Sequence, residues 1–191
     1  MSTFESRLRD DLEPVLASAD PRERISAYHD MPYALFHYDP EEEYELRKHV
    51  TLLQTRLEQR SKRVLRISLA ECLMEALADQ RKIEDWFDAE RAVGTEGLIE
   101  TVGEVLGRRS PLVELVAKRM PTKPDPRTDV VLIHRAGALF PVYRTFSLLE
   151  QLKGRVLVPT VLFFPGHLDG ASGLKFMGVL DAEHNYRPKI F

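Results

Sequence analysis

Two short apolar stretches in the last third of the chain lack the alternation of polar and apolar residues that a half-exposed strand shows. The first is Asp129–His134, rich in valine, leucine and isoleucine, and the second is Val156–Phe164, which ends at a Pro-Gly pair. Such runs are typical of strands buried on both faces. Between them, Thr145–Leu152 has helical spacing, and Gly154 is suited to cap the helix. The order strand, helix, strand predicts a βαβ unit with parallel strands.

Further strands are predicted at Tyr33–Tyr38, Lys62–Ile67 and Leu174–Leu180. The first is followed by an Asp-Pro pair and then by apolar residues at helical spacing, which predicts a helix. The second leads into a Ser-x-x-Glu capping box, which predicts the start of another helix. The segment His167–Gly173 is rich in glycine and is predicted to be a turn that precedes the last strand.

Helical patterns without strands occupy two other parts of the chain. Residues 1–30 are predicted to form N-terminal helices, the first of them kinked or ended by Pro14. Residues 81–120 are helical throughout, which predicts a helical insertion between two strands. The sequence therefore predicts a single α/β domain over residues 1–191, with a mostly parallel central sheet flanked by helices. Its organisation resembles that of a P-loop NTPase core without the Walker A loop.

Composition and charge limit the class of protein. The net charge is −3, and it divides into −6 for residues 1–126 (19 Lys and Arg against 25 Asp and Glu) and +3 for residues 127–191 (8 against 5). This balance favours a mildly basic face over a surface built for nucleic acid. The first residues are charged, and the longest apolar run is far shorter than the roughly 20 residues of a membrane span. A cytoplasmic protein without a membrane contact is expected.

The turn after the first predicted strand is where a P-loop protein holds its phosphates. Here Asp39–Glu45 is strongly acidic, and the sequence contains no Gly-Lys pair. Carboxylates at a helix N-terminus interact with the helix dipole themselves and repel a phosphate. Nucleotide binding at this turn is therefore not expected.

Other candidate chemistry is sparse. A metal at His167 and Asp169 would need further ligands from the segment around His184, so a turn is the favoured interpretation. Cys72 lies on the apolar face of a predicted helix and is interpreted as a core residue. No metal or cofactor is expected. A basic set is interpreted as a solvated surface that complements a helix end, with phosphate contact as the alternative: Arg56, Arg60, Lys62, Arg63 and Arg66.

Polar residues follow two predicted central strands at their carboxyl ends. His134 and Arg135 follow the first, and His167 and Asp169 follow the second. Open α/β sheets place functional groups at this edge. These residue types do not define a reaction, because a histidine and an arginine here can equally bond loop carbonyls.

Three segments resemble the BrxB family, the small component of BREX phage-defence systems. They are VVLIHRAGALFPVYRTFSLLEQL (130–152), VPTVLFFPGHLDGASGLKFMG (158–178) and HNYRPKIF (184–191). The resemblance implies a non-enzymatic protein that acts with a PglZ-type partner of the alkaline-phosphatase superfamily and with other BREX components. It implies contact with nucleic acid only through that complex, and it brings no catalytic residues.

Three functions remain open on this basis: an adaptor in a BREX complex, a degenerate nucleotide-sensing regulator, or a weak nucleic-acid-binding subunit. For the adaptor, the candidate partner-binding residues are tyrosines and arginines near the loop and the tail, since these types often carry interface energy. The alternative for the tail is that it only docks on the sheet. The candidates are Arg135, Tyr143, Arg144, Tyr186 and Arg187.

Overall fold

The computed structural model describes residues 3–25, 32–170, 173–180 and 188–191. Its centre is a six-stranded sheet with the order β2-β3-β4-β1-β6, in which neighbouring strands are parallel, and β5 pairs antiparallel with β4. The strands are β1 (Tyr33–Tyr38), β2 (Arg63–Ser68), β3 (Asp129–His134), β4 (Thr160–Asp169), β5 (Gly173–Phe176) and β6 (Lys189–Ile190). The predicted α/β fold with a mostly parallel sheet is confirmed.

The central strands divide their side chains between two cores. In β3, Val130 and Leu132 point into one apolar cluster, while Val131 and Ile133 point into the other, and all four are fully buried. Successive residues of a strand face opposite sides of the sheet, so a strand covered on both faces needs an unbroken apolar run. This explains why β1 and β3 have the bounds that the sequence predicts.

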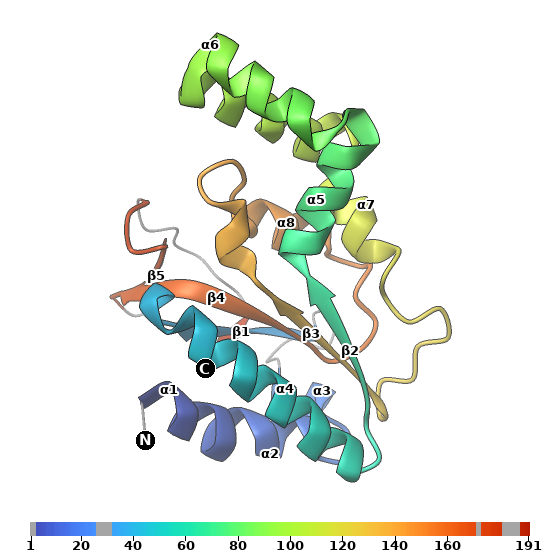
Figure 1. Cartoon of the computed structure of the whole chain (residues 1–191). Helices are drawn as coiled ribbons and strands as arrows, with labels where there is room; N and C mark the ends of the chain where they lie inside the picture. Colours follow the sequence, from blue (N-terminus) through green and yellow to red (C-terminus); the bar gives the residue numbers. More distant parts are fainter. Residues whose placement is uncertain (1–2, 26–31, 171–172, 181–187) are drawn as a thin grey trace.

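Helices cover both faces of the sheet (Figure 1). One layer holds the N-terminal segments α1 (Thr3–Ser6), the π-helix η1 (Arg7–Leu12) and α2 (Glu13–Leu16) together with α4 (Glu43–Gln59). The other holds α5 (Leu69–Gln80), α7 (Leu112–Ala117) and α8 (Thr145–Gln151). The remaining short helices are α3 (Arg22–Ile25), the 3-10 helices η2 (Pro40–Glu42) and η4 (Ala136–Leu139), and the π-helix η3 (Val105–Arg109).

The longest helix, α6 (Ile83–Glu104), lies at the end of the molecule farthest from the N-terminal helices (Figure 1). Gly94 interrupts it with φ 75° and ψ 173°, and glycine adopts this conformation without a side-chain penalty. The base of α6 is anchored where the Trp86 indole Nε1 donates a hydrogen bond to the Leu77 carbonyl at 3.1 Å. Residues 91–96, around the interruption, are all exposed, so α6 forms an arm that projects from the core.

Two local predictions differ from the structure in their bounds. The helix is predicted to kink or end at Pro14; helical backbone continues to Leu16, and its geometry changes just before the proline, where the π-helix η1 ends at Leu12. The strand predicted at Val156–Phe164 begins only at Thr160, because apolar residues before it are buried without joining the ladder. It then runs on to Asp169 and so takes up the first three residues of the segment His167–Gly173 that is predicted to be a turn.

The extension of β4 forms a hairpin with β5 beyond the parallel sheet. At Gly166, where β5 begins to pair, an added Cβ would lie 2.1 Å from the Lys175 carbonyl oxygen, so the backbone approach requires glycine. The end of the chain also pairs with the sheet, since β6 lies beside β1 and the Phe191 N–H donates to the Leu35 carbonyl at 2.8 Å. The described part of the tail therefore docks, as its apolar ending predicts.

Candidate functional site

A cavity of about 190 Å³ lies at the carboxyl ends of the central strands. Its walls come from the turn after β1, from the segment after β3, and from Pro165 in β4. The chain leaves β1 along the face covered by α4 and leaves β3 along the opposite face, covered by α8. The crevice between two such connections is where open α/β sheets bind ligands.

Arg135 brings a cation to this cavity. It follows β3 directly and has a left-handed backbone, with φ 60° and ψ 37°, which is uncommon for a residue other than glycine. Its Nε atom is buried and has no hydrogen-bond partner among the described residues. A buried N–H without a partner costs free energy, so the fold holds Arg135 in this position at a cost.

A second cation reaches the cavity from α4. The Arg47 Nε donates to Glu43 Oε1 at 2.8 Å, and the buried Tyr38 hydroxyl donates to the other carboxylate oxygen of Glu43. Burial, followed by the Glu43 charge, raises the pKa of Tyr38 above its ordinary value, so this hydroxyl keeps its proton. Glu43 is thus neutralised by Arg47, and Arg135 leaves the polar side of the cavity with a net positive charge.

His134 and His37, which lie near the same edge of the sheet, are neutral at physiological pH. Burial, followed by the positive charges of Arg66 and Arg135, lowers the pKa of His134 to about 4. Burial and the Arg7 charge likewise lower the pKa of His37 to about 4. The Arg7 guanidinium lies 2.8 Å from His37 Nε2 and also donates to the His37 carbonyl. His37 therefore helps to hold the N-terminal helix on β1.

The candidate partner-binding residues are dispersed by the fold. Arg135 lines the cavity, whereas Tyr143 is half-buried against the core and accepts a hydrogen bond from Gln151 at 3.2 Å. Arg144 is exposed at the start of α8. Tyr186 and Arg187 lie outside the described residues.

The acidic turn caps its own helix. The Asp39 carboxylate accepts a hydrogen bond from the Glu41 N–H at 3.0 Å, and the Asp39 carbonyl accepts one from the Glu42 N–H at 2.9 Å. Backbone N–H groups that a phosphate loop would offer to an anion are therefore already used. This geometry agrees with the expectation drawn from the sequence.

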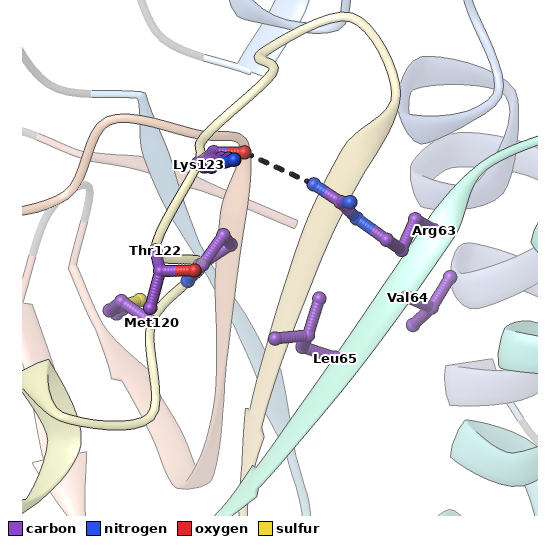
Figure 2. A pocket seen from close by; sticks show the side chains of 7 residues that line it. Arg63, Val64, Leu65, Met120, Thr122 and Lys123 are labelled. Carbon is purple, nitrogen blue, oxygen red and sulfur yellow. Dashed lines mark hydrogen bonds between the residues drawn. The ribbon is translucent and has the colours of Figure 1, made fainter.

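The basic set on and beside β2 bonds to the protein itself. Arg63 donates twice to the buried Asp129, at 2.5 and 2.6 Å, and once to the Lys123 carbonyl at 3.2 Å, as Figure 2 shows for the latter. This arginine borders an open crevice of about 480 Å³ between β2 and residues 120–123. The other members also interact within the protein. Arg56 and Arg60 form ion pairs with Glu13. Lys62 donates hydrogen bonds to two carbonyls, and Arg66 donates one to the Thr51 hydroxyl.

The candidate metal ligands and the single cysteine have structural roles where the structure describes them. In the described part of the chain, no three His, Cys, Asp or Glu side chains gather as metal ligands would. The proposed ligand His184 lies outside that part, and Asp169 lies 3.7 Å from the Lys175 ammonium. Cys72 is fully buried, and burial raises the pKa of its thiol to about 11, so it is a core residue as predicted.

The exposed arm is a feature that the sequence did not reveal. Phe87 and Val93 are 55% and 58% exposed, although apolar residues at helical spacing usually mark a buried face. The arm is also acidic, with one arginine against seven carboxylates: Glu84, Asp85, Asp88, Glu90, Glu96, Glu100 and Glu104. Its second half contacts the loop before α8, since an added Cβ on Gly103 would lie 3.1 Å from the Val142 carbonyl oxygen.

No helix among the described residues is both long enough and apolar enough to cross a bilayer. A family model described as BREX protein BrxB matches residues 65–190. The BREX protein BrxB of Bacillus cereus (strain H3081.97) is 28% identical over 180 residues, which cover 93% of this chain and 92% of that protein. No solved structure matches, and the likeness to a P-loop core is not confirmed. The chain belongs to the BrxB family, which gives it a role in BREX phage defence.

Proposed function

We propose that this protein is a non-enzymatic adaptor of a BREX complex and that it binds a PglZ-type protein of the alkaline-phosphatase superfamily. The observation that carries the proposal is the family match, which spans residues 65–190 and so includes β3, the arm and the part of the cavity wall that follows β3. An adaptor needs surfaces for other proteins rather than a reacting group. Two neighbouring surfaces meet this need.

The first surface is the α6 arm. Exposed Phe87 and Val93 offer apolar contact area, and an aromatic anchor on a projecting helix fits a pocket of a partner. The surplus of carboxylates along α6 calls for a basic surface around that pocket. The indole of Trp86 and its hydrogen bond to α5 fix the base of the arm, so the apolar residues are presented by a rigid element.

The second surface is the start of α8, where Arg144 is exposed beside the half-buried Tyr143. This segment adjoins the arm through the close approach of Gly103 and the Val142 carbonyl. A partner protein that binds the arm can therefore contact Arg144 as well. A guanidinium at this position can bond a partner's carboxylate at the rim of the interface.

The test is co-purification with the PglZ-type protein encoded in the same defence system. Phe87→Ala and Glu96→Lys change the arm, Arg144→Ala changes the start of α8, and Leu157→Ala removes an equally exposed apolar residue elsewhere as a control. We expect the arm variants to lose binding by roughly tenfold or more, because a buried interface anchor contributes about 2 kcal/mol. All four variants are expected to keep the melting temperature of the parent.

Any one of three results would contradict the proposal. They are failure of the PglZ-type protein to co-purify with the parent, parent-like binding by every variant, and a loss of binding in Leu157→Ala as large as that in Phe87→Ala. The adaptor role also predicts that the purified protein alone has no hydrolase or transferase activity, and turnover that survives repeated purification would refute that part.

A further inference from the structure

We infer that the cavity at the carboxyl ends of β1, β3 and β4 is a binding site for a small anion, a carboxylate or phosphate group carried on a small apolar body. The inference does not depend on the adaptor role, because it rests on the walls and charges of the cavity alone. Its position between two connections on opposite faces of the sheet is the first argument.

The polar wall is the second argument. The buried Arg135 Nε has no hydrogen-bond partner among the described residues, and the backbone of this arginine is left-handed. Residues in sparsely populated backbone conformations recur at functional sites. An anion in the cavity could accept a charge-assisted hydrogen bond from the Arg135 guanidinium, which lines it.

The second guanidinium, that of Arg47, enters from another element. Its Nε donates to Glu43, which orients the guanidinium, and its terminal N–H groups take no part in that bond. The Tyr38 hydroxyl restrains Glu43 from the opposite side. Two arginines and one carboxylate leave one positive charge for the ligand to neutralise.

The remaining walls set the size and character of the ligand. They are formed by Pro40, Ala138, Pro165 and Met177, with Gly137 between them. Apolar walls with a few convergent polar groups are typical of small-molecule sites, but sites for drug-sized ligands measure about 300–1,000 Å³. A cavity of about 190 Å³ fits a small organic acid or a monophosphate and is too small to enclose a nucleoside triphosphate.

The experiment titrates the full-length protein with inorganic phosphate and, separately, with malonate, while amide and arginine side-chain NMR signals are recorded. Sodium chloride at matched ionic strength is the reference. Arg135→Gln removes the charge, and Arg135→Lys keeps it but loses the planar fork. Ala138→Leu fills the cavity and keeps both arginines. Arg108→Gln removes a positive charge from the exposed end of η3, outside the cavity, as the matched control.

We expect saturable shifts at Gly137, Ala138 and Arg135 Nε–H in the parent and in Arg108→Gln. The apparent dissociation constant should rise roughly tenfold or more in Arg135→Gln, since a hydrogen bond to a charged group is worth about that factor. It should rise likewise in Ala138→Leu, because the larger side chain takes the space of the ligand. Arg135→Lys should lie between. A preference for malonate would assign the natural ligand to carboxylates, and a preference for phosphate would assign it to phosphate esters.

Shifts that do not saturate, or that are the same in Arg135→Gln and the parent, would overturn the inference. If Arg135→Gln fails to fold, Ala138→Leu decides alone, because it leaves the charges in place. Unchanged anion binding in Ala138→Leu would place the ligand outside the cavity. If Arg135→Gln and Ala138→Leu lose binding to the partner protein but keep the anion-induced shifts of the parent, the cavity is a protein contact and the inference is wrong.

Discussion

Phe163→Ala should destabilise the protein more than the removal of the same atoms from an exposed phenylalanine. Phe163 is fully buried in β4, and its ring lies 5.6 Å from the Phe36 ring between centroids. Burying a phenylalanine removes about 200 Å² from water, which at about 25 cal/mol per Å² is worth about 5 kcal/mol. Alanine keeps part of that contact while the core relaxes incompletely, so the expected loss is about 3–5 kcal/mol.

The matched control is Phe87→Ala, because that ring is 55% exposed on the α6 arm. Its free energy of unfolding should change by less than about 1 kcal/mol, as surface substitutions usually do. Urea denaturation followed by circular dichroism measures both variants against the parent. Equal losses in the two variants, or a soluble Phe163→Ala protein with an unchanged midpoint, would show that β4 is not a central strand.

Two further predictions concern charge. Burial alone would raise the pKa of Asp129, but hydrogen bonds from Arg63 and the Asp125 N–H outweigh it and hold the pKa below the ordinary value. The carboxylate therefore stabilises the fold above pH about 4 and loses this effect as pH falls through the lower folded-state pKa. Asp129→Asn should cost about 1–3 kcal/mol at neutral pH and less in acid, and a pH-independent difference between the two unfolding curves would refute this. Calorimetry should detect no micromolar ATP binding, because Asp39 caps the turn itself; affinity that is lost on changing that turn would contradict it.

The strands that the sequence predicts best are those in which burial and pairing coincide. In β3 every apolar residue both faces a core and joins the ladder, so the run and the strand have the same bounds. In the run that begins at Val156, the two properties separate. Val156 and Val158 are buried before the ladder starts, and the exposed His167 belongs to it after the apolar run has ended. An apolar pattern reports burial, and it predicts pairing only where the two coincide.

The candidate site was predictable only in part for a similar reason. The sequence places Arg135 after a strand, at the edge where α/β sheets bind ligands. It does not bring Arg47 to the same cavity, because α4 meets that edge only when β1 lies beside β4 in the strand order. The exposure of Phe87 was equally hidden, since the helical pattern predicts a buried face, whereas the buried residues of α6 are Trp86 and Val102.

One segment connects the features that bear on function. Residues 135–144 follow β3, form one wall of the cavity through Gly137 and Ala138, and then pass under the arm at Val142 before α8 begins. Residues 130–152 are also one of the stretches that resemble the BrxB family. Connections from a strand to the next helix in βαβ units usually have about 2–6 residues, and this one is longer, from residue 135 to residue 144. Its position between an anion-sized cavity and an exposed acidic arm is explained if the segment serves binding, and the two surfaces it joins are where that binding should be sought.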